Sequence, residues 1–489
     1  MTDSATSRQQ ALQRRDSEFD VLVIGGGIVG AGVARDAALR GLRIALVEQA
    51  DFAFGTSSRS SRLLHGGLRY LEQGEIALVR EASKEKMLLS RLAPHLSQPL
   101  PFVFPSWNGS GRPLWKLAVG TQLYELICGG WNPRLASIWS AKRLLAEIPG
   151  LRREDLGGGV RYLDALTNDA RLVIDTLRSA HQGGALLLNY VRFESSDRSG
   201  GKWHCSVRDV LSEKTLELRA KTVVNAAGAW ASGLPHSRVR LRLTKGAHIV
   251  ADRSRLPVPA AVVLSQGDRI LFVIPWGERV ILGTTDTEYT GDPSDVRTEA
   301  SDVEYILEVV NSAFPRIGLT RADLISSWAG VRPLIAPETN STEAPSDISR
   351  KHEIRVAEPG WIDVAGGKLT TYRLMAEQVV DQLGNFLDAK LPRSRTATTP
   401  ILALADRSFS GVLPPPLAAD VVRRCCRDEW AIHLDDILLR RTSWHFYHSN
   451  QSEIARTVAP WMADELGWDA AQTQGELERY FRTAEFIAP

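Results

Sequence analysis

The stretch FDVLVIGGGIVGAGVARDAALRGLRIALVE, close to the N-terminus, constrains the fold more than any other part of the chain. Its first apolar run, residues 19–24, suits a buried parallel strand. An Ala-rich stretch as far as Arg40 suits a helix, and a second apolar run covers residues 42–47. The order strand, helix, strand predicts a Rossmann-like α/β unit with a parallel sheet.

Three glycines between the first strand and the helix indicate what this unit binds. Gly25, Gly27 and Gly30 have the spacing GxGxxG. The first permits a tight turn, the second lets the backbone approach a pyrophosphate, and the third lets helix and strand pack closely. The helix N-terminus offers free N–H groups and a positive dipole to the anion. Glu48 ends the second strand, where a carboxylate accepts hydrogen bonds from a ribose 2′-OH, so we expect a site for NAD or FAD.

Composition narrows the class of protein. With 489 residues, 44% of them hydrophobic and 24% charged, the chain is long enough for two or three globular domains. The net charge of +2 and the scattered basic residues give no nucleic-acid signature. The four cysteines have no CxxC spacing and no histidine partners at metal-ligand spacing. We therefore expect no metal site and no disulfide framework, and a reducing compartment fits best.

Neither a secretory signal nor a membrane span is predicted. Residues 1–18 are polar and lack the apolar segment of a signal, so we expect a disordered lead. No apolar run reaches the roughly 18 residues that cross a bilayer. Residues 114–131 come nearest, although Lys116 and Glu125 interrupt them, and they fit either a core-facing helix or a surface that rests on a membrane. We expect a cytoplasmic protein, with contact to the cytoplasmic face of the inner membrane as the alternative.

A dense group of hydroxyls follows the second strand, where an NAD-binding domain would continue with a helical crossover. Residues 51–72 are DFAFGTSSRSSRLLHGGLRYLE, and their hydroxyl side chains suit a phosphate or a ribityl chain. The hydroxyls belong to Thr56, Ser57, Ser58, Ser60 and Ser61. The HGG segment, residues 65–67, allows the backbone to pass close under a flat ring, and Arg69 and Tyr70 follow directly. A Ser-rich capping loop is the alternative.

Six motifs occur in one order along the chain. They are TSSRSSRLLHGGLRYLE (56–72), VVNAAGAW (223–230), TKGAHIV (244–250), IPWGERVILGTTDTEYTGDP (274–293), GVRPL (330–334) and GGKLTTYR (366–373). Together they resemble FAD-dependent (aerobic) glycerol-3-phosphate dehydrogenases, of the D-amino-acid-oxidase-like flavoprotein superfamily, over residues 18–385. The resemblance implies bound FAD and oxidation of sn-glycerol 3-phosphate to dihydroxyacetone phosphate by hydride transfer to flavin N5. Electrons would then pass to a quinone or, as in oxidase relatives, to oxygen.

The resemblance also implies a domain organisation. A Rossmann-like FAD-binding domain of the glutathione-reductase and para-hydroxybenzoate-hydroxylase type is expected from residues 19–100, 160–230 and 330–385. An antiparallel-sheet substrate domain takes residues 101–159 and 231–329. Residues 386–489 form a C-terminal helical cap that is shorter than is usual in the family. A homodimer is one assembly that fits.

For the FAD, the resemblance points to the glycine motif, the hydroxyl-rich segment and the last motif. The expected contacts are Gly25, Gly26, Gly27, Ile28, Gly30, Glu48, Thr56, Ser57, Ser60, His65, Gly66, Gly67, Leu68, Gly228, Lys368, Leu369 and Thr370.

Recognition of the substrate's phosphate dianion needs fixed positive charge. Arg69, Arg332 and Lys368 each lie in a matching motif, and Arg350 is a further candidate with a weaker local motif. For each arginine the alternative is a surface salt bridge. The candidates to hydrogen-bond the substrate or product are Tyr70, Lys245 and His248.

Oxidation at C2 requires loss of the hydroxyl proton, and a neutral imidazole near pH 7 suits that role. His65 and His248 are the two candidates, and we prefer His65; its alternative role is packing against the flavin. Arg332 suits electrostatic stabilisation of the developing alkoxide. Lys368, or the helix N-terminus after Gly367, suits the negative charge of the reduced flavin near N1 and C2=O.

Two local patterns carry smaller expectations. NDARLV (168–173) predicts a helix start with Asp169 as its cap and Arg171 in a structural role. HFYH (445–448) has two histidines three positions apart with no third ligand, so we expect surface histidines.

Two other functions compete with the leading one. A flavin oxidoreductase of the superfamily could act on a different phosphorylated polyol or on a hydroxy or amino acid, but the cationic group Arg69, Arg332 and Lys368 favours a phosphate. The second is a non-catalytic flavin-binding subunit, which absence of flavin reduction by any polyol phosphate would identify.

Overall fold

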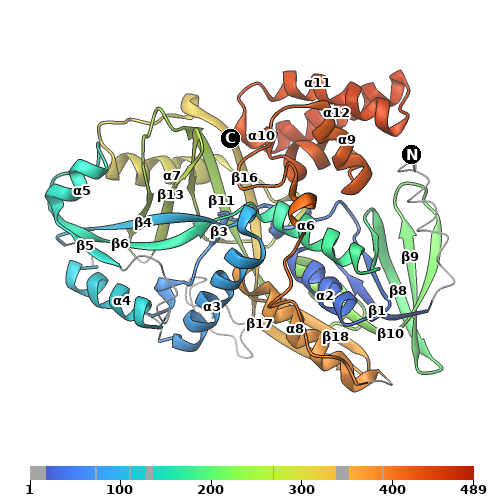
Figure 1. Cartoon of the computed structure of the whole chain (residues 1–489). Helices are drawn as coiled ribbons and strands as arrows, with labels where there is room; N and C mark the ends of the chain where they lie inside the picture. The colour runs from blue at the N-terminus through green and yellow to red at the C-terminus, as the bar shows by residue number, and fades with distance from the viewer. Residues whose placement is uncertain are drawn as a thin grey trace.

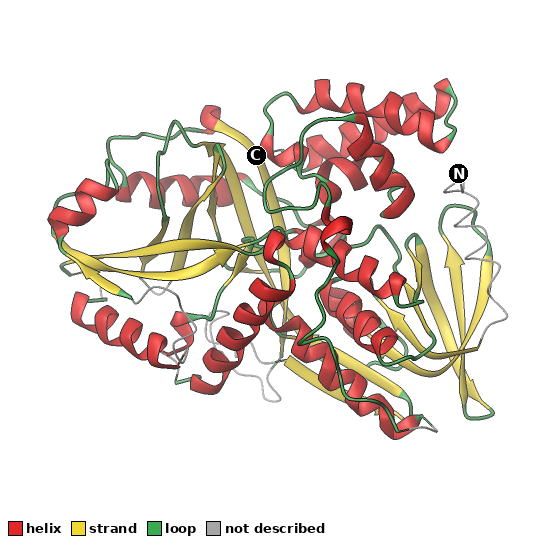
Figure 2. Ribbon diagram, viewed as in Figure 1, coloured by secondary structure: helices red, strands yellow, loops and turns green. Residues whose placement is uncertain are grey.

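The computed structural model describes residues 18–71, 74–109, 112–127, 136–267, 269–336, 352–387 and 390–488. Two β-sheets dominate these residues, with helices against their faces and a helical unit at the C-terminal end (Figure 1; Figure 2). The mixed α/β class expected from the sequence is confirmed.

The smaller sheet carries the glycine motif. Its described strands are β1 (Glu18–Ile24), β2 (Ile44–Val47), β7 (Leu186–Leu188), β8 (Val191–Ser199), β9 (Lys202–Asp209), β10 (Thr215–Asn225), β17 (His352–Glu358) and β18 (Trp361–Gly366). β1 pairs in parallel with β2 on one side and β10 on the other, and β18 continues the parallel order beyond β10. Helix α2 (Ile28–Leu39) connects β1 to β2, so the predicted strand, helix, strand unit is confirmed.

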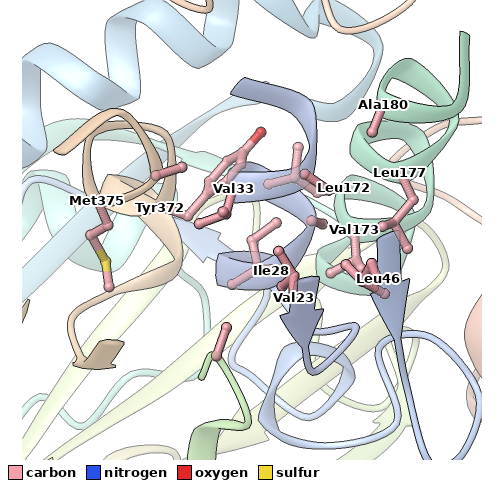
Figure 3. Close-up of a cluster of buried hydrophobic side chains, with 14 of the residues drawn as sticks. Val23, Ile28, Val33, Leu46, Leu172, Val173, Leu177, Ala180, Tyr372 and Met375 are labelled. Atoms are coloured by element: carbon pink, nitrogen blue, oxygen red, sulfur yellow. The ribbon is translucent and has the colours of Figure 1, made fainter. Parts of the chain in front are cut away.

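Three helices cover one face of the smaller sheet. α2 packs against α6 (Asp169–Gln182) and α8 (Tyr372–Leu383), and Figure 3 shows Val33, Leu172 and Tyr372 meeting there. Gly32 allows this approach, because a Cβ there would lie 2.9 Å from the Tyr372 ring. Each such side chain contributes about 1.5–3 kcal/mol when fully buried, so the cluster holds α2, and with it the glycine turn, in place.

The larger sheet is mostly antiparallel. Its described strands are β3 (Leu63–Leu64), β4 (Gln98–Trp107), β5 (Ser137–Trp139), β6 (Leu156–Leu166), β11 (Leu241–Asp252), β12 (Ala261–Gln266), β13 (Arg269–Trp276), β14 (Arg279–Gly283), β15 (Thr287–Glu288) and β16 (Leu324–Ile335). β13 and β14 form a hairpin, since Trp276 of β13 pairs with Arg279 of β14 across the turn.

Helices cover both faces of the larger sheet. α5 (Ala141–Glu147) and α7 (Ala300–Ala313) share one apolar core with it, while α3 (Ile76–Leu92) and α4 (Leu114–Ile127) share another on the opposite side (Figure 1). The predicted domain limits near residues 100, 159 and 329 each fall inside a strand of this sheet, namely β4, β6 and β16. The next described strands after β6 and β16, namely β7 and β17, belong to the smaller sheet, whereas the strands on either side of β4 in the chain, β3 and β5, belong to the larger sheet.

The C-terminal unit is helical. It contains α9 (Ala419–Asp428), the π-helix η11 (Asp436–Arg441), α10 (Trp444–Tyr447), α11 (Gln451–Leu466) and α12 (Ala470–Phe486). Leu438, Trp444 and Val458 belong to its own apolar core. Among the described helices of the whole chain, none is long and apolar enough to cross a bilayer.

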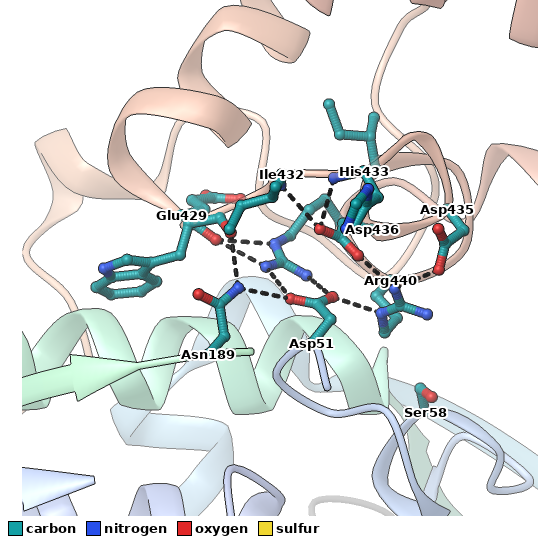
Figure 4. Close-up of polar contacts among 12 residues, drawn as sticks. Asp51, Ser58, Asn189, Glu429, Ile432, His433, Asp435, Asp436 and Arg440 are labelled. Atoms are coloured by element: carbon teal, nitrogen blue, oxygen red, sulfur yellow. Dashed lines mark hydrogen bonds and ion pairs between the residues drawn. The ribbon is translucent and has the colours of Figure 1, made fainter. Parts of the chain in front are cut away.

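Buried ion pairs join this unit to the domain of the smaller sheet (Figure 4). Asp51, which follows β2, accepts from Arg440 at 2.5 Å and from Arg441 at 2.6 Å. Arg171 of α6 reaches Glu429 at 2.6 Å, so its predicted structural role is confirmed.

Two local expectations are wrong. Asn168, not Asp169, caps α6, because its side chain accepts the backbone N–H at the third helical position. Asp169 instead accepts the N–H and the hydroxyl of Ser60, at 2.9 and 2.7 Å. His445 is buried rather than on the surface, since α12 packs over it and Tyr480 Oη lies 2.8 Å from its Nδ1. Burial lowers the pKa of His445 to about 4.

Candidate active site

The glycine turn after β1 is packed too tightly for side chains. Gly25 has a φ of +109°, and a Cβ on it would lie 2.5 Å from the carbonyl oxygen of Ala226, just after β10. A Cβ on Gly30 would lie 1.9 Å from the carbonyl oxygen of Gly25. Turn, helix and neighbouring strand therefore meet at backbone distance, as the motif predicts.

Glu48 and Ser57 lie at the open end of α2. Glu48 accepts the N–H of Gly26 at 2.7 Å and the N–H of Ala50 at 2.9 Å. Burial raises the pKa of Glu48, and the two N–H donors oppose that rise. Ser57 Oγ accepts the N–H of Ile28 at 3.0 Å, which places a hydroxyl at the helix N-terminus. A carboxylate and a hydroxyl thus stand beside the glycine turn.

A first cavity, with about 1180 Å³ of empty space, runs along this turn. Its lining includes Gly25, Gly27, Ile28, Glu48, Thr56, Ser57, Gly228, Lys368 and Leu369. The wall at Gly27 is bare backbone, and a Cβ there would lie 3.1 Å from Ser57 Oγ. Bare backbone and a helix N-terminus suit a pyrophosphate, and the Glu48 carboxylate suits a ribose, so the residues present fit FAD.

A second cavity, with about 1090 Å³ of empty space, continues from the first, because both are lined by Ile28, Ser57 and Lys368. It brings together most of the predicted substrate and catalytic residues from distant parts of the chain. These are His65, Tyr70, His248, Arg332 and Lys368, and the expected FAD contacts Ser60 and Thr370 line the same cavity. A dinucleotide extended along the first cavity would therefore end among them.

Arg332 of β16 is held at the wall of the second cavity. Its guanidinium donates to Asp286 Oδ1 at 3.1 Å and to Thr284 Oγ1 at 2.9 Å. Gly246 on the adjacent strand β11 leaves room for it, since a Cβ there would lie 2.3 Å from the guanidinium. The side chain remains 20% exposed, so its positive charge is fixed but accessible.

His248 of β11 lies deeper in the same wall. Its Nε2 is 2.8 Å from the hydroxyl of Ser61, and its ring stacks on Trp328 with 5.2 Å between centroids. Burial, together with the positive charges of Arg332 and Arg62, lowers the pKa of His248 to about 3. The imidazole is therefore neutral at physiological pH and acts as a hydrogen-bonding group.

The HGG turn lies at the junction of the two sheets. The backbone N–H of His65 donates to Thr370 Oγ1 at 3.3 Å, which ties the turn to the segment before α8. The N–H of Gly66 donates to Tyr124 Oη at 3.1 Å. Gly67 has a φ of +81°, which explains a glycine at this position.

A positive charge stands beside this turn. The Nζ of Lys368 lies 3.5 Å from the centroid of the Tyr70 ring, a cation–π contact inside the second cavity. Lys368 also lines the first cavity, so its ammonium sits where the two cavities meet.

Three predicted residues lie elsewhere or outside the described part. Lys245 does not line these cavities, because Glu299 and Asp302 each hold its Nζ at 2.8 Å. Arg350 lies outside the described residues, and so does the side chain of Arg69. Their roles in binding phosphate stay predictions.

The structure adds residues that sequence reasoning missed. Thr284 and Asp286 line a third cavity and bond directly to the predicted Arg332, while Ser61, which the sequence placed only in the hydroxyl-rich segment, bonds to His248. Thr284 and Asp286 lie within the motif ILGTTDTEY, so the motif was the available signal, although nothing in it shows their partners.

This third cavity opens from the second and is mostly apolar. It has about 1770 Å³ of empty space and shares His65, Tyr70 and Arg332 with the second cavity. Its apolar lining comes from both the larger sheet and α4 and includes Leu68, Phe102, Phe104, Leu117, Leu123 and Phe272.

Comparison with known proteins gives consistent matches. The family described as FAD dependent oxidoreductase matches residues 20–373, and the C-terminal domain of alpha-glycerophosphate oxidase matches residues 408–473. Glycerol-3-phosphate dehydrogenase 2 of Mycobacterium tuberculosis is 37% identical over 526 residues, which cover 96% of this chain and 88% of that protein. The aerobic glycerol-3-phosphate dehydrogenase of Staphylococcus saprophyticus is 37% identical, covering 80% and 71%.

Solved structures agree with these matches. The glycerol-3-phosphate dehydrogenase of Bacillus halodurans, complexed with FAD, superposes with a TM-score of 0.79 at 29% identity, covering 100% of this chain and 98% of that one. The L-alpha-glycerophosphate oxidase of Mycoplasma pneumoniae, at 17% identity and a TM-score of 0.62, shares the fold. The chain has the glycine turn after β1 and matches these proteins over nearly its whole length, so it belongs to the family of FAD-dependent glycerol-3-phosphate dehydrogenases.

Proposed function

We propose that this flavoenzyme oxidises sn-glycerol 3-phosphate to dihydroxyacetone phosphate. The observation that supports the proposal is the joined pair of cavities. One is lined by the glycine turn after β1, and the other by His65, Arg332 and Lys368. When bound, FAD supplies the acceptor for the hydride from C2. The relatives named above support the substrate.

His65 is the group that takes the proton from the C2 hydroxyl. It lines both the second and third cavities, where a substrate would meet the cofactor. His248 suits this role less well, because its pKa of about 3 makes it a weak base and Ser61 occupies its Nε2. The Ser61–His248 pair therefore orients the substrate by hydrogen bonds.

Arg332 and Lys368 provide the positive charge for the anionic substrate. Arg332 is preorganised by Asp286 and Thr284, so little conformational freedom is lost when it binds a phosphate or a developing alkoxide. Lys368 lies near the expected flavin ring and stabilises negative charge on the reduced cofactor. Arg69 and Arg350 are further candidates for the phosphate.

We also propose a quinone as the electron acceptor, reached through the third cavity from a membrane surface. α4 lines that cavity with Leu117, Val119 and Leu123, and it also exposes Trp115 and Leu126, at 69% and 77%. An apolar stripe of this kind on a helix too short to span a bilayer suits contact with its interface. The free buried thiols Cys205, Cys425 and Cys426 support a reducing, cytoplasmic location.

A stereochemical assay tests the proposal. The holoenzyme is supplied with a dye acceptor and with sn-glycerol 3-phosphate, sn-glycerol 1-phosphate or glycerol, and dihydroxyacetone phosphate is measured. We expect product from the first compound alone. Equal turnover of glycerol would overturn the assigned role of the cationic groups, since glycerol carries no phosphate.

A further inference from the structure

We propose that Tyr124 of α4 is a positioning residue for the HGG turn, acting with Asp164 and Lys86. Three elements converge on Gly66, because Tyr124 comes from α4, Asp164 from β6 and Lys86 from α3. All three side chains are at least 95% buried, at 0%, 4% and 4% exposure. Burying a tyrosine hydroxyl together with an ion pair costs free energy unless each polar group is hydrogen-bonded. Packing alone therefore does not explain why these three side chains are buried together.

The hydrogen bonds form a directed network that ends on the turn. Lys86 Nζ donates to Asp164 Oδ1 at 2.7 Å, and Tyr124 Oη donates to the same oxygen at 2.9 Å. The Tyr124 oxygen in turn accepts the N–H of Gly66 at 3.1 Å, and Asp164 Oδ1 accepts the same N–H more weakly at 3.4 Å. A hydroxyl that donates to a carboxylate becomes a better acceptor, which strengthens its hold on that N–H.

Contact distances show how closely the turn is held. A Cβ on Gly66 would lie 2.3 Å from Tyr124 Oη and 2.5 Å from Ser83 Oγ, so the backbone rests directly on these two hydroxyls. On the other side the neighbouring residue, His65, is tied through its backbone to Thr370. The turn is therefore clamped between α4 and the segment before α8, and this clamp sets the direction of the His65 imidazole.

The kinetic measurements in this test rest on the proposed function. Tyr124→Phe removes the nearer acceptor of the Gly66 N–H, leaves only the longer contact to Asp164 Oδ1 at 3.4 Å, and keeps the ring in place. The holoenzyme of this variant should retain FAD and keep its KM for sn-glycerol 3-phosphate within about twofold. Its kcat should fall on the order of tenfold, because a small misplacement of a reacting group is enough to slow the chemical step. The visible absorption band of the bound flavin should shift as well.

Two comparisons make the test specific. Tyr480→Phe removes an equally buried tyrosine hydroxyl, bonded to His445 in the C-terminal unit, and should leave kcat and the flavin band unchanged. Asp164→Asn keeps the size of the carboxylate but weakens the acceptor strength of Tyr124, and it should change kcat in the same direction as Tyr124→Phe. This second variant decides the matter if Tyr124→Phe does not fold.

Two results would overturn the proposal. One is an unchanged kcat and flavin band in Tyr124→Phe, and the other is a raised KM with an unchanged kcat, which indicates substrate binding. The flavin band is recorded without substrate. A wild-type enzyme that sn-glycerol 3-phosphate does not reduce would therefore contradict the proposed function and still leave the spectral shift in Tyr124→Phe as a test of positioning.

Discussion

Arg332 is the side chain on which we expect substrate recognition to depend most directly. Its guanidinium is already held by hydrogen bonds to Asp286 and Thr284. Arg332→Lys keeps the charge but loses the planar guanidinium and its paired N–H donors, so we expect kcat/KM for sn-glycerol 3-phosphate to fall about 10²- to 10³-fold. Steady-state kinetics at matched FAD content measure the change. Arg355→Lys, at an exposed arginine of β17, serves as the control and should match the wild type. An Arg332→Lys enzyme with full activity would show that the planar guanidinium is dispensable.

The two active-site histidines should differ in their effect on the pH profile. The pKa of His248 is about 3, far below its ordinary value, so this imidazole is neutral from pH 5 to 9 and does not titrate there. We expect His248→Asn to lower kcat/KM while the acidic limb of the profile remains. His65→Asn should abolish that limb, because the base itself is removed. Loss of the limb in His248→Asn alone would reverse the two assignments.

At this scale the sequence predicts glycines better than charged side chains. Gly25 and Gly30 make the close backbone approaches that their spacing requires, and Glu48 lies beside the same turn, since all three belong to one strand, helix, strand unit. The position of the Lys245 side chain could not be predicted from the sequence in the same way. The carboxylates that occupy it, Glu299 and Asp302, lie far along the chain, and only the folded sheet brings them together.

Among the elements, α4 has the most direct consequence for function. Tyr124, on one face of α4, contacts the HGG turn, and another face exposes Trp115 and Leu126. We expect the double variant Trp115→Gln, Leu126→Gln to lose binding to vesicles of anionic phospholipid in co-sedimentation. Activity with a soluble dye should be retained, because neither side chain lines the cavities.

Leu404→Gln provides the matched control for that experiment. Leu404 is 81% exposed but lies in the segment that leads to the C-terminal unit, away from α4. It should co-sediment like the wild type. Equal binding by the wild type and the α4 double variant would refute the assigned membrane surface.

The helix itself could be predicted from the sequence, but its environment could not. Residues 114–131 are apolar on more than one face, so the pattern fits both a core helix and a membrane surface. The structure shows that α4 buries Leu117 and Tyr124 and still exposes a stripe. Capping at α6 was missed for a related reason: Asn168 and Asp169 are both good caps, and the partner Ser60 that engages Asp169 is distant in sequence.

For the whole molecule, the C-terminal unit is fastened to the nucleotide-binding domain by Asp51. Burial opposes ionisation of Asp51, but Arg441 and Arg440 outweigh it and hold its pKa below the ordinary value (Figure 4). Asp51→Asn leaves Arg441 without a carboxylate, and breaking such a buried pair costs about 3–5 kcal/mol. We expect a lower Tm and faster loss of FAD, because Asp51 follows Glu48 closely. A thermal scan and flavin fluorescence measure the two effects.

An exposed ion pair gives the comparison. Arg423 pairs with Asp420 on the surface of the C-terminal unit, where solvent screens the charges. Arg423→Gln should leave Tm and FAD retention unchanged. If Asp51→Asn behaves like Arg423→Gln, the buried cluster does not hold the two units together.

The order of the motifs can be read along the chain, whereas the pairing of the strands between them cannot. β4, β6 and β16 cross the predicted limits because strand pairing in the larger sheet joins segments that are far apart in sequence. Periodicity within one segment contains no information about such partners. The joined cavities likewise appear only once the two sheets are in place.

Anaerobic reduction of the bound flavin tests the central claim most directly. The yellow holoenzyme is mixed with sn-glycerol 3-phosphate in the absence of oxygen, and the flavin absorption band is followed in a stopped-flow instrument. We expect rapid bleaching and release of dihydroxyacetone phosphate. A flavin that dithionite reduces but sn-glycerol 3-phosphate leaves yellow would contradict it.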